Sequence, residues 1–338
     1  MKYIISVAAV LAAAVLLINS AAVTEAVRGA VTMCLDVMIP SLFAFTVLSL
    51  YLQNSGLADI ALKPLTKPLS KLLRLPGELC TVFILGNIGG YPVGARLLRT
   101  LAEQGRLSEQ DAGRMLCCCY GAGPSFVISV VGVRAFGSAT IGALLFGACF
   151  LSSLIVAVVV CRRGERITLK PRGARYDLSA QCFIGSVMAA AKVMLTVCAM
   201  ITVFAAGLAM VGAENAGGTL SALLEISRLG GIVPTGALAM PVCGALISFG
   251  GACVVLQVVA IGSGRLRMKG FLLSRIPAAA LSAAFSALGT LLPPEYIAVS
   301  APNVISAQVF SVNMGMSLCV LIMCGMLLAT DKNKSGLM

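Results

Sequence analysis

Runs of apolar residues long enough to cross a lipid bilayer recur from one end of this chain to the other. A membrane-spanning α-helix needs about 20 consecutive, mostly apolar residues. Hydrophobic residues make up 59% of the chain and charged residues only 11%, with a mean hydropathy of +0.99. We therefore expect an all-α polytopic membrane protein with about eight transmembrane helices and no separate soluble domain. The expected spans are residues 3–21, 32–53, 115–133, 138–160, 184–211, 238–262, 271–292 and 304–329.

The first run has two interpretations. Lys2 precedes it and small residues follow it before Glu25, which is also the pattern of a cleaved signal peptide. Its apolar stretch from Tyr3 to Ile18 is long for the hydrophobic region of such a signal, and further spans follow it. We therefore expect this helix to be retained.

Two further apolar segments, residues 78–95 and 219–234, are interrupted by glycine, proline or charge. Irregular backbone at membrane depth is tolerated only inside protein or along a polar cavity. The sequence therefore predicts two re-entrant hairpins, each entering and leaving the membrane on one side. The first of them contains GNIGGYPVGARL (86–97).

The net charge of +12 is carried by basic residues in the connections between the apolar runs, as the positive-inside rule describes. We expect both termini and all basic clusters in the cytoplasm, because the connections expected outside contain only Arg28 and Arg134 as basic residues. Those outer connections are 22–30, 134–137, 212–218 and 293–302. The basic clusters are Lys63, Lys67, Lys71 and Arg74; Arg96, Arg99, Arg106 and Arg114; residues 162–175; Arg265, Arg267, Lys269 and Arg275; and Lys332 and Lys334.

The order of spans and hairpins occurs twice. Residues 32–160 and residues 184–292 both run span, hairpin, span, span, and the second unit is inverted relative to the first. Inverted repeats with broken segments at matching positions are typical of secondary transporters with a binding site near the membrane midplane. The alternative is chance, because a chain with many spans is easily cut into similar halves. We expect one membrane domain (1–338), with a basic cytoplasmic linker at 161–183 and a last transmembrane helix at 304–329.

The residue types argue against metal, redox and enzymatic chemistry. The chain has no histidine, and its 13 cysteines lie mostly within apolar runs, where cysteine packs as a small apolar residue. Neither paired carboxylates nor a phosphate-binding loop is evident, so we expect no enzyme, no metal site and no cofactor.

Three groups of residues are candidates for a substrate site. A hairpin tip at Asn87, Gly89, Gly90 and Tyr91 would leave backbone groups unpaired, which favours contact with a ligand, whereas Gly86 and Gly94 fit close helix packing equally well. Glu225 and Arg228, with Ser227 between them, share a helical face in the second hairpin, and charges at membrane depth are functional candidates. The alternatives are that they neutralise each other or that they lie at the outer surface near the loop at 212–218.

The third group consists of two glycine-rich helix starts. Helix N-termini present free N–H groups and partial positive charge, so two of them near the midplane favour an anionic substrate, and Lys192 within a span adds to this bias. The alternatives are helix packing for the glycines and an interhelical hydrogen bond for Gln257. The residues of this group are Gly123, Pro124 and Ser125 in GAGPSF (121–126), and Ser248, Gly250, Gly251 and Gln257 in and after FGGACV (249–254).

Four ordered motifs carry a resemblance to a known family: GYPVGA (90–95), YGAGPSFVISVVGV (120–133), LLEISR (223–228) and ALISFGGACVVLQ (245–257). Over roughly residues 30–300 the chain resembles the nucleoside-recognition (Gate) domain membrane proteins, and among them the sporulation integral membrane protein YlbJ (SpoVV) family. The resemblance implies a spore-forming bacterium, a multi-pass protein of the cell or forespore membrane, and a role in moving dipicolinate.

The leading hypothesis is therefore a secondary transporter of a small anionic metabolite, dipicolinate above all. A nucleoside or nucleobase transporter is the alternative in the same class, and a non-transporting sporulation membrane protein is the alternative in another class. A homo-oligomer and a coupling cation stay open as partners. Nucleic acid is not expected as a partner.

Overall fold

The computed structural model describes residues 2–172, 176–212, 218–231, 236, 238–262 and 264–290. Over these residues the chain forms helices and no strand, which confirms the all-α prediction. Five helices in this part of the chain are long and apolar enough to cross a membrane, so the protein is a multi-pass membrane protein. They are Ser20–Ser55, Ala139–Arg162, Ala180–Met210, Ala239–Gly262 and Met268–Gly289. The expected last span, 304–329, and the connection at 293–302 lie outside the described residues.

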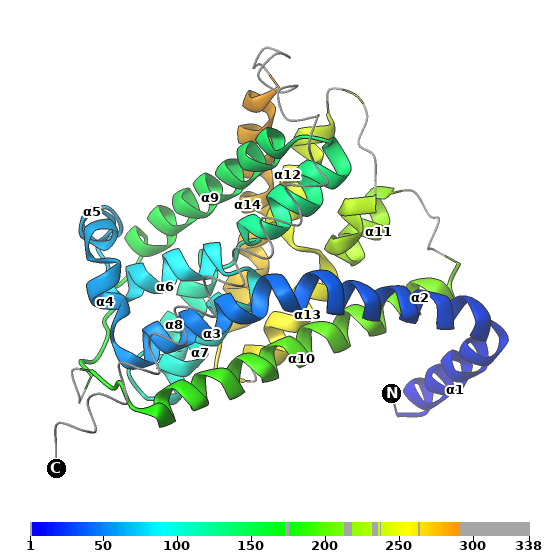
Figure 1. Cartoon of the computed structure of the whole chain (residues 1–338), viewed down its shortest axis with the longest axis horizontal. Helices are drawn as coiled ribbons and strands as arrows, with labels where there is room; N and C mark the ends of the chain where they lie inside the picture. The colour runs from blue at the N-terminus through cyan, green and yellow to red at the C-terminus, as the bar shows by residue number, and fades with distance from the viewer. Residues whose placement is uncertain are drawn as a thin grey trace.

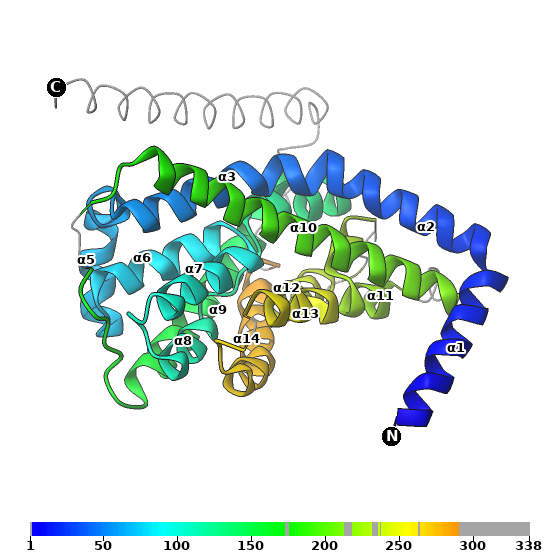
Figure 2. The ribbon, with the colours of Figure 1, turned by 90° about the horizontal axis from the view of Figure 1, so that it is seen from below.

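Two long helices lie side by side along one face of the molecule, and we call them the outer layer (Figures 1 and 2). One is continuous from Ser20 to Ser55 and comprises α2 (Ser20–Met33), the π-helical stretch η1 (Cys34–Met38) and α3 (Ile39–Ser55). The other is α10 (Ala180–Met210), which runs in the opposite direction (Figure 1). Buried residues of both helices, such as Val47 and Val193, belong to the same apolar core.

The first helix, α1 (Lys2–Ile18), projects away from the rest of the molecule (Figure 2). It ends at Ile18, the chain changes direction at Asn19, and α2 begins at Ser20. The expected span at 3–21 is thus a helix of 17 residues, and apolar side chains along it such as Leu17 are exposed.

The first basic cluster forms a short amphipathic helix rather than a loop. After α4 (Ala58–Ala61), α5 (Lys63–Leu73) carries three lysines at every fourth position and buries Leu73. Residues four apart share one face of a helix, so the lysines lie together, while Leu65 and Leu72 are exposed. A helix of this kind is typical of a membrane surface.

The first hairpin forms where the glycines and the proline predicted a break. α6 (Gly77–Ile88) and α7 (Tyr91–Glu103) are joined by Gly89 and Gly90. All residues from Leu79 to Asn87 are buried, so the hairpin lies inside the protein. Its entry into the membrane from the cytoplasmic side stays a prediction.

The base of this hairpin is held by charged groups that the sequence did not single out. Glu78, in the first turn of α6, accepts two hydrogen bonds from Arg106, at 2.6 and 2.7 Å, and pairs with Arg172 of the linker at 3.4 Å. Arg172 also donates to the backbone carbonyl of Asn54 at 2.8 Å. The linker is thereby tied both to the hairpin and to the end of α3.

The expected span at 115–133 is wrong as one continuous helix. α8 (Glu109–Leu116) ends before the cysteine triplet, residues 117–123 are not helical, and η2 (Ser125–Ala135, π-helical) follows Pro124. Proline disfavours helical backbone in the residue before it, and the glycines at 121 and 123 stabilise a helix poorly. We call residues 117–123 the crossing segment.

The span at 238–262 is confirmed by length but is also broken. α12 (Ala239–Phe249) ends at Gly250, and α13 (Gly251–Gly262) follows. Gly250 has a φ of +87° and Gly251 a φ of +73°, a backbone conformation that glycine adopts without strain. The break in α12–α13 lies against the crossing segment, because Tyr120 donates a hydrogen bond to the carbonyl of Phe249 at 3.3 Å.

The remaining described helices enclose these breaks. α9 (Ala139–Arg162) and α14 (Met268–Gly289) pack against each other, and the Ser152 hydroxyl donates to the carbonyl of Ala278 at 2.7 Å. The second hairpin segment contains α11 (Gly218–Leu224) and the 3₁₀-helix η3 (Ile226–Gly231), and residues 232–235 lie outside the description. The inverted relation of the two units stays a prediction.

Candidate functional site

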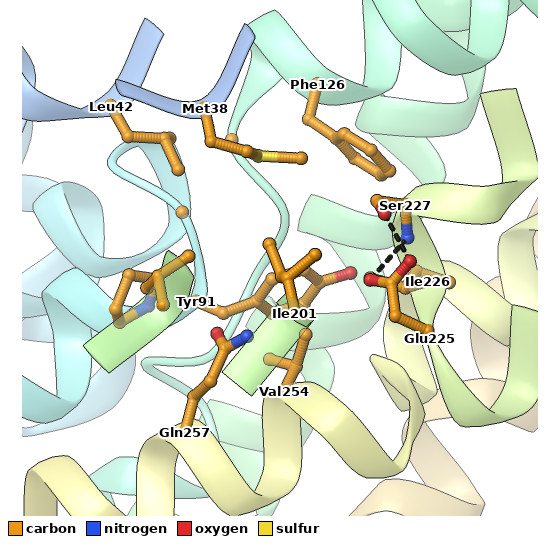
Figure 3. Close-up of a pocket in the computed structure, with 14 residues that line it drawn as sticks. Met38, Leu42, Tyr91, Phe126, Ile201, Glu225, Ile226, Ser227, Val254 and Gln257 are labelled. Carbon is orange, nitrogen blue, oxygen red and sulfur yellow. Dashed lines mark hydrogen bonds between the residues drawn. The ribbon is translucent and has the colours of Figure 1, made fainter. Parts of the chain in front are cut away.

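A pocket lies between the tip of the first hairpin, the start of η2, the junction of α11 and η3, and the long helices (Figure 3). Its volume open to the centres of water molecules is about 40 Å³. A single water needs roughly 10–15 Å³ by this measure, so the pocket has room for a few waters. The lining residues are Met38, Leu42, Gly90, Tyr91, Pro92, Gly123, Phe126, Val197, Ile201, Glu225, Ile226, Ser227, Val254 and Gln257.

The hairpin tip forms one wall of this pocket. Gly90 has φ +92° and ψ 166°, a region open essentially to glycine alone, and a Cβ there would lie 3.3 Å from Leu42 Cδ2. Tyr91 follows it at the start of α7, and its hydroxyl donates to the carbonyl of Ile247 at 2.6 Å. The tip is therefore fixed to α12 by a buried hydrogen bond.

Glu225 supplies the carboxylate of the pocket. It lies between α11 and η3, where the helix changes type, and its side chain is buried. The backbone N–H of Ser227 donates to Glu225 Oε1 at 3.1 Å, and the Ser227 hydroxyl donates to Oε2 (Figure 3). Among the residues that line the pocket, Glu225 alone carries a charge.

The end of α12, behind the pocket, is capped by side chains from three parts of the chain. The last carbonyls of a helix have no partner within it and need donors from elsewhere. Tyr91 of α7 donates to the carbonyl of Ile247, Arg275 of α14 to that of Ser248 at 3.4 Å, and Tyr120 of the crossing segment to that of Phe249. The three final carbonyls of the broken helix are thus satisfied without water.

Arg275 is the functional candidate that sequence reasoning missed. We expected it in a cytoplasmic basic cluster, but it lies in α14 and is 2% exposed. Its guanidinium also donates to the carbonyl of Cys117, at the end of α8, and lies 4.6 Å from the centre of the Tyr120 ring. It makes no ion pair with a carboxylate among the described residues. Its position inside an apolar helix, two turns past the helix start, was the available signal.

The structure brings together six of the fourteen predicted site residues at the pocket: Gly90, Tyr91, Gly123, Glu225, Ser227 and Gln257. The other eight do not line it: Asn87, Gly89, Pro124, Ser125, Arg228, Ser248, Gly250 and Gly251. Ser125 and Gly251 do begin helices, as the sequence predicted.

Several of these residues hold the breaks in place instead. Asn87 is buried and donates to the carbonyls of Phe83 and Cys118, both at 2.9 Å, which ties the hairpin to the crossing segment. A Cβ on Gly94 would collide with the Cys119 carbonyl oxygen, so Gly94 has the packing role that we left open. Gly250 likewise leaves room for the hydroxyl of Tyr120.

Neither of the two cations expected near the substrate lines the pocket. Arg228 is half-buried on η3 and forms no ion pair with Glu225 among the described contacts, although the two share a segment. Lys192 is exposed on α10, opposite to the side of that helix that places Val197 and Ile201 at the pocket. The pocket therefore lacks the positively charged side chains that we predicted for it.

The chemistry of the pocket is mostly apolar. Tyr91 and Phe126 contribute aromatic rings, and the outer layer contributes Met38, Leu42 and Ile201, which the sequence analysis did not select. The polar groups are the Glu225 carboxylate, the Ser227 hydroxyl and the Gln257 amide. No group of three potential metal ligands occurs among the described residues. Such a lining suits a small, partly apolar molecule.

Comparison with known proteins gives one informative similarity. The chain is 30% identical over 145 residues to the sporulation integral membrane protein YlbJ of Bacillus subtilis (strain 168). The alignment covers 42% of this chain and 35% of the relative, so the chain matches about a third of the length of that protein. No protein-family model and no solved structure matches the chain. Over this matched portion, the resemblance to the YlbJ family seen in the sequence motifs is confirmed.

Proposed function

We propose that the protein is a secondary transporter of a small anionic metabolite and that dipicolinate is its substrate. The observation that carries the proposal is the pocket, which lies where a glycine-tipped hairpin and two interrupted helices meet inside a membrane protein. Broken helices at membrane depth leave backbone groups that must be satisfied by other means. A scaffold protein gains nothing from this cost, whereas broken helices around a central site are typical of secondary transporters.

Dipicolinate is a flat aromatic ring with two carboxylates, and several features of the pocket support it. The rings of Tyr91 and Phe126 and the side chain of Leu42 provide apolar surfaces for such a ring. The similarity to a sporulation membrane protein supports the same substrate. Binding of such a ring requires the walls to separate, because the pocket has room for only a few waters.

A nucleoside or nucleobase is the second candidate, and Glu225 favours it. A carboxylate accepts hydrogen bonds from hydroxyl and N–H groups, and the Gln257 amide can both donate and accept. Both side chains line the pocket. Sugar hydroxyls or the N–H groups of a base would satisfy them without any change in charge.

Uptake into lipid vesicles that contain the purified protein tests the proposal. We expect radiolabelled dipicolinate to accumulate and unlabelled dipicolinate, but not uridine, to compete with it. Accumulation of uridine alone would favour the second candidate. If neither compound enters these vesicles faster than it enters protein-free vesicles, the protein does not transport them.

The proposed topology, with both termini and the linker 161–183 in the cytoplasm, is tested by labelling. Arg166 is exposed in the linker, so we expect Arg166→Cys to react with a membrane-impermeant thiol reagent only after the membrane is opened. The unmodified protein is the control, because most of its described cysteines are buried. Labelling of Arg166→Cys on intact cells would contradict this topology and place the linker outside the cell.

A further inference from the structure

We propose that Glu225 is the proton-binding group of this transporter, so that the anionic substrate enters the pocket together with a proton. The inference rests on the proposed function and deepens it by naming the coupled ion. It follows from the position of the carboxylate, its uncharged hydrogen-bond partners and the lack of an ion pair to it among the described contacts.

The carboxylate of Glu225 lines the pocket and is otherwise buried in the protein. The side chain is 3% exposed, and its two oxygens take hydrogen bonds from the backbone N–H and the hydroxyl of Ser227 (Figure 3). Both donors suit an ionised carboxylate, yet neither carries a positive charge. A buried charge without a counter-ion is costly, and such residues in transporters commonly carry protons.

The charged and titratable groups around Glu225 come from several elements. Arg228 on η3 is the cation that interacts electrostatically with the carboxylate, and Arg134 on η2 lies at the far end of η3, where its Cδ is 3.9 Å from a Cβ placed on Gly230. Neither forms an ion pair with Glu225 among the described contacts. The other groups that interact electrostatically with the carboxylate are Tyr91 of α7, Cys253 of α13 and Cys34 of η1. α11 and α12 contain no charged residue.

An anion cannot bind favourably beside this carboxylate while it is ionised. Two like charges a few ångströms apart repel each other strongly in a water-poor pocket. Protonation removes the repulsion and converts Glu225 from an acceptor into a donor, whose O–H can then bond to a carboxylate of the substrate. Substrate and proton therefore assist each other's binding to the same extent.

The proton balance of one cycle is simple. The ionised carboxylate takes one proton from a hydronium ion on the side where the substrate enters, so that one O–H bond forms on Glu225, one O–H bond of hydronium breaks, and no other bond changes. After the pocket opens to the opposite side, the substrate leaves and the carboxyl group returns the proton to water there. One turnover thus moves one substrate and one proton in the same direction.

Binding measurements at different pH values test this linkage directly. The probe is dipicolinate, over a pH range in which both of its carboxyl groups are ionised. We expect its Kd for the purified protein to rise about tenfold per pH unit wherever one proton is taken up with each substrate. Glu225→Gln keeps the shape of a protonated carboxyl and cannot titrate, so its Kd should not change with pH.

Transport in vesicles separates binding from coupling. With an inward proton gradient, we expect the natural protein to accumulate dipicolinate and to acidify the vesicle interior. Glu225→Gln should still exchange internal for external dipicolinate but should not accumulate it. Glu109→Gln is the matched control, because this carboxylate is half exposed and paired with Arg265 at 3.3 Å, away from the pocket. It should behave as the natural protein does.

The outcomes are distinguishable. If uptake by the natural protein depends neither on pH nor on the proton gradient, the inference is overturned, but the proposed transport is not. Proton-driven accumulation by Glu225→Gln would have the same consequence. Absence of any binding or uptake in the natural protein would remove the proposed function itself. If Glu225→Gln does not give folded protein, Ser227→Ala serves in its place. This variant removes a donor to the ionised carboxylate. The range of pH over which the Kd changes should therefore move to higher pH.

Discussion

Replacing Gly90 by leucine should abolish uptake while the protein still inserts into the membrane at nearly normal abundance. Gly90 has φ +92° and ψ 166°, where any other residue is strained by about 1–3 kcal/mol. A leucine there would also extend toward Leu42 and fill a pocket that holds only a few waters. The measurement is substrate uptake per molecule of protein, with abundance determined by quantitative blotting of membranes.

Two further variants separate the causes. Gly90→Ala has the same backbone strain without the bulk, so it should retain part of the uptake. Gly147→Leu is the control for adding an apolar side chain, because a Cβ on Gly147 of α9 meets nothing within 4 Å. If Gly90→Leu lost abundance in proportion to uptake, the tip would serve packing rather than transport.

Arg275→Met should destabilise the folded protein severely. The guanidinium bonds the carbonyl of Cys117, the first residue of the crossing segment, and that of Ser248 in the last turn of α12. Hydrogen bonds to charged groups are worth about 1.5–3 kcal/mol each, and the two carbonyls would be left unsatisfied in the interior. The relief from burying a charge offsets only part of this loss. We expect a large fall in the thermal unfolding midpoint of the detergent-solubilised protein, or no folded protein at all.

The conservative change is informative as well. Arg275→Lys keeps the charge but replaces the planar fork of donors by a single ammonium group, so it should recover part of the stability. Lys269→Met, an exposed substitution in the first turn of the same helix, should leave the unfolding midpoint unchanged. Normal stability of Arg275→Met would mean that water satisfies the two carbonyls instead.

The breaks in the helices were predictable because their causes are local. Glycine widens the range of backbone conformations at its own position, and proline narrows it. The turn at Gly89 and Gly90 and the helix start at Gly251 therefore followed from the sequence. At 115–133 we gave the same signal too little weight. The helix is interrupted before Pro124, but the apolar composition suggested one span. Composition measures affinity for lipid and does not reveal whether the backbone stays helical.

The contents of the pocket were less predictable because they depend on tertiary contacts. Met38 and Ile201 come from helices far apart in the sequence, and nothing in either helix distinguishes the residue that faces a pocket from one that faces a neighbour. The positions of Arg228 and Lys192 outside the pocket lining were not predictable for a related reason, since the rotation of a helix about its axis decides where a charge points. Arg275 was grouped with a cytoplasmic cluster because nearness along the chain to other basic residues says nothing about depth in the membrane.

The capped end of α12 has a mechanical consequence. Its donors come from α7, the crossing segment and α14, and separating them would leave carbonyls unpaired in a medium without water. These four parts must therefore move as one rigid body. The outer layer touches the pocket through Met38, Leu42 and Ile201, whose dispersion contacts can slide without loss of a hydrogen bond. It is pinned at one end, where Gln53 donates to Glu78 at 3.0 Å. Access to the pocket would then arise when the outer layer swings about that end. The glycine-rich breaks would keep their conformation during this motion and would not act as hinges.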